Sequence, residues 1–155
     1  MMRRTMLAGM LFLSATGACR AGTLPAPTAL SAAQRAVIDQ AVRGIAVNEG
    51  RSMVEMWPDA KKVAEFMCAP AALPALQADK GKGVDKVFLG SGDDAQGLVL
   101  HDATRLTGEG QARVGNDWMN FTFECVLNPE SGKVSSFHAN LSKTRAATGG
   151  PGTTP

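Results

Sequence analysis

The chain has no tyrosine, few aromatic residues and no surplus of either charge once its first residues are set aside. Of 155 residues, 5% are aromatic and 45% are hydrophobic, so a globular core has to rely on aliphatic side chains. Without residues 1–18, which contain Arg3 and Arg4, 14 basic residues face 14 acidic ones. A nucleic-acid partner would require a clustered basic excess. The composition therefore argues against nucleic acid, and the length fits a single domain.

The sequence also lacks an apolar run long enough to cross a membrane. Arg3 and Arg4 precede an apolar stretch that begins at Met6 and fades after about 11 residues, whereas a membrane span needs about 20. A basic start, a short apolar run and small residues before a cysteine are the three parts of a secretory signal. We expect residues 1–18 to be a signal peptide and the protein to be exported, to the periplasm or the periplasmic face of a bacterial membrane.

Cysteine is scarce, and its odd count bears on how the signal is removed. The segment Thr16-Gly17-Ala18-Cys19 is similar to a bacterial lipobox, although Thr16 stands where a Leu-like residue is usual. Lipidation of Cys19 would leave one pair among the three cysteines. Conventional cleavage after Gly17 or Ala18 stays open as the alternative. Membrane contact is expected only through a lipid on Cys19, and residues 19–30 are predicted to be a flexible spacer.

Helices are predicted in the first half of the folded region. Ser31 and Gln34 fit a capping box, and apolar residues recur at helical spacing up to Ile45, with an end near Asn48 and Gly50. A second helix is predicted from Trp57-Pro58-Asp59, with Pro58 near its start, Lys61, Lys62 and Glu65 outward, and Pro70 and Pro74 breaking it. Its inner face would contain Ala60, Val63, Ala64, Met67 and Cys68.

Strands are predicted in the second half. Short candidates are 84–89, 98–101 and 111–114, and strict alternation over 118–127 indicates a strand with one covered face. A turn at 128–132 and a return strand over 134–141 complete a β-hairpin. We therefore expect an α+β domain over 31–143, with two N-terminal helices packed on one face of a small antiparallel sheet, and a disordered tail over 144–155.

Cys68 and Cys125 are predicted to form a disulfide bond. Cys68 lies on the inner face of the second helix and Cys125 on the inner face of the strongest strand, and these faces meet if the helix packs on the sheet. In an oxidising compartment two thiols in contact become a disulfide. The alternative is a pair of separate buried thiols. A zinc site that adds His101 and His138 is not expected, because no two ligands have the usual short spacing.

The remaining polar features offer little chemistry. His101 and Asp102 are neighbours, but adjacent strand residues point to opposite faces, and no nucleophile motif accompanies them. Gly81-x-Gly83 and Gly108-x-Gly110 are interpreted as turns because neither opens a helix after a buried strand. Trp118 begins a strand on its less apolar face. Trp118 and His101 are the candidate partner surface, and no catalytic residue, metal or cofactor is assigned.

The second half resembles a known family. The residues that carry the resemblance are Gly110-x-Ala112-x-x-Gly115, Trp118-Met119-x-Phe121-x-Phe123-x-Cys125 and Val134-x-x-Phe137, with Ala103 before them. They are similar to a proteobacterial family of exported domains catalogued as domain of unknown function 930, over residues 56–141. Met119 departs from that pattern, since an aromatic residue is common there, and so does the loop over 81–97. The resemblance implies two paired cysteines in an exported domain and no assigned activity.

Three functions follow as hypotheses. The first is a non-catalytic envelope protein whose sheet binds an unknown envelope protein or a small ligand. The second is a small envelope hydrolase, or an inhibitor of one, that uses His101, Asp102 and Glu124. The third is a purely structural lipoprotein. A pocket that brings His101 to a carboxylate would favour the enzyme, and an exposed Trp118 on a smooth face would favour binding.

Overall fold

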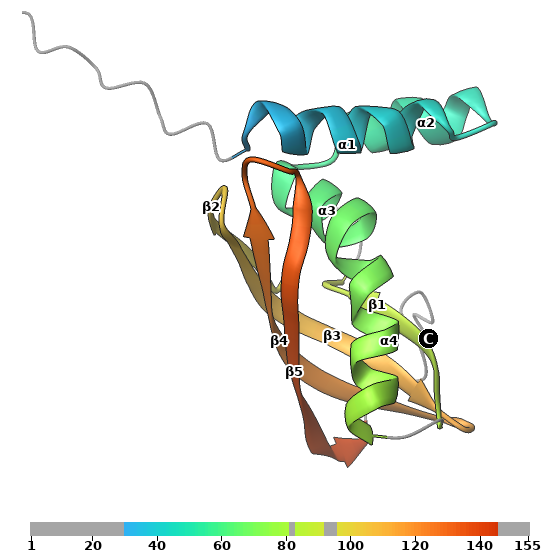
Figure 1. Ribbon diagram of the computed structural model, residues 1–155. Coiled ribbons are helices and arrows are strands. Elements are labelled where there is room, and N and C mark those ends of the chain that lie inside the picture. Colours follow the sequence, from blue (N-terminus) through green and yellow to red (C-terminus); the bar gives the residue numbers. More distant parts are fainter. Residues whose placement is uncertain (1–29, 81–82, 92–95, 146–155) are drawn as a thin grey trace, which may run out of the picture.

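A computed structural model describes residues 30–80, 83–91 and 96–145 of the chain. Helices come first and strands second, which confirms the α+β class (Figure 1). The predicted signal peptide, Cys19, most of the spacer and residues 146–155 lie outside these ranges. Leu30, the last residue of the predicted spacer, is only 4% exposed and belongs to the core. Leu30 therefore belongs to the folded domain and not to the flexible spacer.

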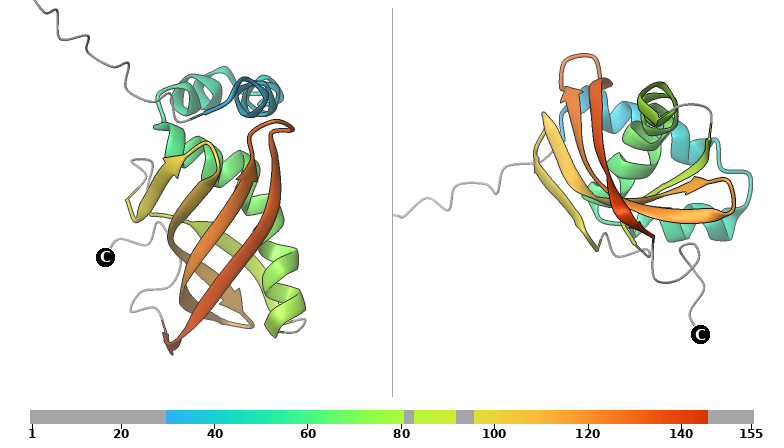
Figure 2. Two further views of the ribbon diagram at one scale, coloured as in Figure 1. Left: turned by 60° about the vertical axis from the view of Figure 1, so that its left-hand side comes forward. Right: turned by 90° about the horizontal axis from the view of Figure 1, so that it is seen from below.

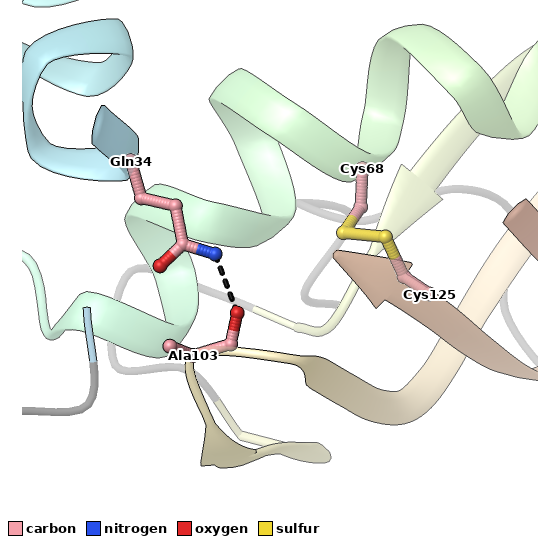
Figure 3. The surroundings of a disulfide bond; sticks show 4 residues. All are labelled: Gln34, Cys68, Ala103 and Cys125. Atoms are coloured by element: carbon pink, nitrogen blue, oxygen red, sulfur yellow. Dashed lines mark hydrogen bonds between the residues drawn. A yellow bond between two sulfur atoms is a disulfide. The ribbon is translucent and has the colours of Figure 1, made fainter. Parts of the chain in front are cut away.

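The first helix, α1 (Ala32–Arg43), begins at the predicted capping box. Gln34 N donates to Ser31 Oγ at 3.2 Å, and Ser31 N donates to Gln34 Oε1 at 2.9 Å. Gln34 is fully buried, and its Nε2 donates to the carbonyl oxygen of Ala103, which ties α1 to the turn between two strands (Figure 3). The capping glutamine thus also links the helix to the sheet, and both ends of its buried amide are paired.

The predicted end of this helix near Asn48 and Gly50 was wrong. The helix ends at Arg43, with Gly44 as its C-cap in a right-handed conformation, and Asn48 begins a separate helix, α2 (Asn48–Glu55). The Arg51 guanidinium donates to the carbonyl oxygen of Ile45 at 2.8 Å, which supplies a partner for the chain between the two helices. A contact of this kind, between an arginine and a carbonyl six residues earlier, follows no capping pattern that the sequence displays.

The second predicted helix starts where expected and then runs further. It consists of α3 (Asp59–Val63), the π-helical segment η1 (Ala64–Cys68) and α4 (Ala69–Lys80). Prolines were expected to break it, yet Pro70 lies in the first turn of α4 and Pro74 lies inside it. Because η1 runs directly into α4, Pro70 removes one N–H donor from a continuing helix, and the π turn lies immediately before it, where the hydrogen-bond pattern changes. Burial of Ala72 and Leu76 offsets the loss at Pro74, which is about 3 kcal/mol.

Lys61 was predicted to point into solvent and is instead buried, with 7% of the residue exposed. Its Nζ donates to Glu65 Oε1 at 2.7 Å and lies 5.5 Å from the centre of the Trp57 ring. Trp57 in turn stacks on Phe66. The aliphatic stem of a lysine covers apolar surface while its ammonium group keeps a charged partner, and Glu65 provides that partner here.

The sheet in the described part of the chain has five antiparallel strands and curls around α4. The strands are β1 (Val84–Leu89), β2 (Leu98–Asp102), β3 (Arg105–Val114), β4 (Asp117–Asn128) and β5 (Lys133–Arg145). The order is β1-β3-β4-β5, and β2 pairs with β3 alongside β1. Helix α4 contacts β1 and β5, which lie at opposite edges of the sheet, and the views in Figure 2 show the strands wrapping around it.

Strand β3 is longer than predicted because Gly108 and Gly110 lie inside it and do not form a turn. Gly108 pairs with Phe123 and Gly110 with Phe121 on the next strand. A Cβ at Gly110 would meet the Phe121 ring and the carbonyl oxygen of Phe88 at less than 3.0 Å. Glycine is thus required at Gly110 because an aromatic ring occupies the space of its side chain.

The hairpin of β4 and β5 confirms the firmest strand prediction. Asn128 Oδ1 accepts hydrogen bonds from the N–H groups of Glu130 and Ser131, and Gly132 takes a left-handed conformation with φ of 66°. Residues on one face of β4 are buried against the helices, as alternation predicted: Phe121, Phe123, Cys125 and Leu127. Strand β5 continues to Arg145, so it includes the first two residues of the predicted tail.

The disulfide bond between Cys68 and Cys125 joins the helical layer to the middle of the sheet (Figure 3). Its Cα atoms are 6.1 Å apart, within the usual range for such bonds, and both residues are fully buried. Cys68 is the last residue of η1, so the π turn ends at the cross-link. Within the described ranges, no helix is long and apolar enough to span a membrane.

Candidate functional site

The face of the sheet turned away from α4, here called the outer face, carries the polar residues of β3 and β4 in matched rows. Glu109 is the Cα partner of Thr122, and Gln111 is the Cα partner of Asn120. Their inward neighbours, Phe121 and Phe123, are buried. The alternation that builds the core on one face therefore lines up carboxylate, amide and hydroxyl groups on the other.

The chain makes a detour between β1 and β2, of which the structure describes Gly90, Ser91, Gln96 and Gly97, and these residues form a rim beside the polar rows. Both strands pair with the same edge of β3, and the chain leaves and rejoins that edge at Glu109. Gly90 N donates to Glu109 O at 2.7 Å, and Glu109 N donates to Gly97 O at 2.9 Å. Gly90 and Gly97 have φ of 71° and 72°, which a residue with a side chain rarely adopts, so glycine permits both corners.

The rim and the rows enclose a hollow of about 640 Å³, here called the polar hollow. This volume lies in the range of small-ligand sites, about 300–1,000 Å³. The lining consists of Ser91, Gln96 and Gly97 from the detour, Glu109, Gly110 and Gln111 from β3, Asn120, Phe121 and Thr122 from β4, and Ser142 from β5. Three strands and the rim contribute side chains that are distant in the sequence.

Hydrogen-bonding groups dominate the lining, and Glu109 is the charged one among these residues. Gln111 Nε2 donates to Asn120 Oδ1 at 3.2 Å, which holds the two amides side by side. Gln111 Oε1 is inaccessible to solvent and has no hydrogen-bond partner in the structure. An unpaired buried acceptor costs about 1–3 kcal/mol, so a donor that reaches it would stabilise the site.

An aromatic pair adjoins the hollow on the same face. Phe88 is the Cα partner of Gln111, and Trp118 lies two residues before Asn120 on the same face of β4. Each aromatic residue is therefore a direct neighbour of one of the two amides that line the polar hollow. The two ring centres are 5.4 Å apart. Both residues are half-buried, so Trp118 is partly covered and not fully exposed.

Cations cover part of this pair. The Arg113 guanidinium lies 6.0 Å from the centre of the Trp118 ring and donates two hydrogen bonds of 2.8 Å to Asp85. Hydrogen bonding from Arg113 holds the pKa of the Asp85 carboxyl below its ordinary value. Lys86 Nζ lies 5.0 Å from the centre of the Phe88 ring. These contacts fix the orientation of the rings at the edge of the hollow.

His101 lies at the other end of the outer face and is exposed. Its Nε2 is 2.8 Å from Thr107 Oγ1, and the strand register shifts between Leu100 and Asp102. Thr107 and Arg113 are six positions apart on β3, which is about 20 Å along a strand. His101 and Trp118, predicted to form one partner surface, therefore lie in separate parts of the face, with the polar hollow between them.

Asp102 and Glu124 have partners other than His101. Asp102 Oδ1 accepts hydrogen bonds of 2.6 Å from Thr104 Oγ1 and Thr104 N, and the bond from the hydroxyl, followed by that from the backbone, lowers the pKa of Asp102. Glu124 Oε2 lies 3.6 Å from Arg105 Nη1, and both side chains are exposed. In the described part of the chain, no hydrogen bond joins His101 to a carboxylate, so the enzyme hypothesis lacks its acid–base pair.

Sequence reasoning missed the polar hollow. Alternation on β4 identified Asn120 and Thr122 as the wetter face, and Gln111 was assigned to a short strand over 111–114, but Glu109 was missed because Gly108 and Gly110 suggested a turn. Among the residues that the structure describes, no three His, Cys, Asp or Glu side chains are grouped so that they could hold a metal ion. His138, on β5, is exposed and is the Cα partner of Glu124.

Comparisons with known proteins found none that is similar to this chain. No family model matches the chain, and neither the curated proteins nor the solved structures contain a match.

Proposed function

We propose that this protein is an exported, non-catalytic binding domain of the bacterial envelope that takes a small polar ligand in the polar hollow. The observation that carries this proposal is the register of β3 with β4, which sets Glu109, Gln111, Asn120 and Thr122 side by side under the rim at Ser91 and Gln96. Such a set offers both donors and acceptors in a fixed arrangement, which is how a binding site orients a ligand.

Export is supported by the sequence and by the state of the cysteines. Arg3 and Arg4 before a short apolar run are typical of a secretory signal. The Cys68–Cys125 disulfide is compatible with an oxidising compartment such as the periplasm, where such bonds persist. Cys19 would carry a lipid in the lipoprotein form, and conventional cleavage nearby would give a soluble periplasmic form. Membership of the family catalogued as domain of unknown function 930 remains a prediction.

Binding is favoured over catalysis by the chemistry of the outer face. His101 contacts Thr107, Asp102 is occupied by Thr104, and Glu124 is near Arg105. The described residues that line the polar hollow supply amides, hydroxyls and one carboxylate, and none of them is a His or a Cys. General acid–base catalysis needs a base within hydrogen-bond reach of its substrate and matched to a second group. The lining supplies hydrogen bonds without such a pair.

The test is a nuclear magnetic resonance titration of the isotope-labelled protein, purified after expression of the full chain. The probe is the low-molecular-weight fraction of a periplasmic extract. We expect shifts of the backbone signals of Glu109, Gln111, Asn120 and Thr122. The double variant Gln111→Leu, Asn120→Leu should lose these shifts, because its apolar side chains cannot hydrogen-bond the ligand.

A matched control is His138→Leu, which makes the same kind of change at an exposed outer-face position outside the hollow. It should shift as the unmodified protein does. Shifts confined to another surface, shifts that survive in the double variant, or no shift in the unmodified protein would each contradict the proposed site.

A further inference from the structure

We infer that the ligand of the polar hollow is an oligosaccharide, with one sugar ring in the hollow and the next over the Phe88–Trp118 pair. This inference rests on the proposed function and names its ligand class. It comes from the juxtaposition, on one sheet face, of a polar enclosure and an aromatic surface.

The polar part matches the chemistry of a sugar ring. Neighbouring hydroxyls of a sugar present a donor and an acceptor a short distance apart, and planar carboxylate and amide groups bind such pairs with both of their end atoms. Glu109 supplies the carboxylate, and Gln111 and Asn120 supply the amides. Thr122, Ser142 and Ser91 add hydroxyls that can donate or accept. The carboxylate of Glu109, the acidic side chain among the described lining residues, disfavours phosphate or another anion as the ligand.

The Phe88–Trp118 pair lies beside the polar hollow, where the second sugar ring of a bound oligosaccharide would lie. Phe88 and Trp118 each flank an amide of the Gln111–Asn120 pair, on β1 and β4 respectively. Residues two apart on a strand share a face and are about 7 Å apart, which is close to the length of one sugar unit. The C–H groups on a sugar ring carry partial positive charge and are attracted to the negative face of an aromatic ring.

The dimensions also fit a ligand longer than one sugar. A volume of about 640 Å³ exceeds the need of a single ring, and the hollow is partly open to solvent. Hydrogen bonds in the hollow would fix one ring, and apolar contact with the tryptophan would add affinity only for a ligand that reaches it. Affinity should therefore rise from one sugar to three, and the rise should depend on Trp118.

Isothermal titration calorimetry and magnetic-resonance titration of the purified protein test this with defined probes: N-acetylglucosamine, its β-linked trimer, and maltotriose. We expect at least one trimer to bind and to shift the signals of both the hollow and Trp118. Trp118→Ala should lower the affinity for the trimer by about tenfold and leave the affinity for the single sugar unchanged. Trp118→Phe should restore most of the affinity, which a purely structural role of the indole would not explain.

Two further variants keep the result interpretable. Trp118→Leu retains apolar cover over Arg113 and Phe88 but lacks a ring face, so it should bind the trimer as weakly as Trp118→Ala while remaining folded by circular dichroism. Val99→Ala alters an exposed apolar residue elsewhere on the outer face, 54% exposed, and should bind normally.

The outcomes separate the two proposals. If neither trimer binds while the extract still shifts the hollow, the oligosaccharide inference is overturned and the proposed function stands. If the trimer binds with equal affinity in Trp118→Leu, the second sugar position over the aromatic pair is wrong. If no probe and no extract shifts the hollow, the proposed function fails as well.

Discussion

Loss of the Cys68–Cys125 bond should remove a large part of the stability of the domain. The cysteines are 57 residues apart in sequence, and closing a loop of that length lowers the entropy of the unfolded chain by an amount equivalent to about 4 kcal/mol. A domain of this size has a free energy of unfolding of about 5–15 kcal/mol. The bond also links η1 covalently to β4, so its removal leaves the helical layer held on the sheet by non-covalent contacts alone.

Urea unfolding of the purified protein, followed by circular dichroism with and without reductant, measures this contribution. With a slope of about 1–3 kcal/mol per molar urea, a loss of about 4 kcal/mol lowers the midpoint by about 1–4 M. The reduced protein retains both sulfur atoms, so the comparison isolates the bond from the packing of the side chains. The Cys68→Ala, Cys125→Ala variant should unfold at a low midpoint whether or not reductant is present.

Two results would refute this reasoning. A midpoint that reductant leaves unchanged, with both thiols shown to be free by alkylation, would mean that the bond does not constrain the unfolded chain. A double alanine variant as stable as the oxidised protein would mean that helix and sheet are held together without it.

Two further predictions concern the sheet and its turns. Gly110→Ala should lower the free energy of unfolding by about 1–3 kcal/mol in urea titrations, because its Cβ would overlap the Phe121 ring and the Phe88 carbonyl oxygen. The control is Gly83→Ala, whose Cβ would meet Val114 Cγ1 at 3.4 Å and should be tolerated. Equal stability of the two variants would refute the crowding at Gly110. Thr104→Val should raise the pKa of Asp102 toward its ordinary value in a carboxyl titration by magnetic resonance, since the Thr104 hydroxyl is the first cause of its lowering. The folded-state pKa of Asp102 lies below its unfolded-state pKa, so the stability that this group contributes is present above about pH 4 and is lost as the pH falls through the folded-state pKa. The unmodified protein and the Thr104→Val variant should therefore differ less in stability at low pH. An unchanged pKa of Asp102 in the variant would contradict the role of the hydroxyl.

Local patterns predicted the parts of the fold that local interactions determine. The capping box at Ser31 and the turn at Asn128–Gly132 formed as expected because their hydrogen bonds join residues a few positions apart. Alternation in β4 placed Cys125 inward, and helical spacing placed Cys68 inward, so their meeting could be inferred from the packing of one layer on the other.

Features that depend on distant contacts were not predictable. The proline at Pro74 would end an isolated helix, and only burial against the sheet keeps α4 intact. Gly110 signals a turn until the Phe121 ring is placed beside it. Lys61 is hydrophilic by type, and its burial depends on Trp57 and on Glu65 as its partner.

In the candidate site, too, the residues set by local pattern could be predicted and those set by distant contacts could not. Asn120 and Thr122 could be assigned to the solvent face from β4 alone. The polar hollow needs the pairing of β3 with β4 and the detour that leaves the sheet edge at Gly90 and returns at Gly97. No pattern in the sequence specifies that β1 and β2 share one edge of β3, so the rim could not be placed before the topology was known.

Export and the oxidation of Cys68 and Cys125 are tested together by the intact mass of the protein isolated from cells that express the full chain, after alkylation with and without reductant. We predict a chain that lacks residues 1–18, with Cys68 and Cys125 alkylated only after reduction. A lipid on Cys19 would add its own mass, and conventional cleavage would not. An uncut chain with all three cysteines alkylated without reductant would contradict the proposed compartment and the disulfide in the cell.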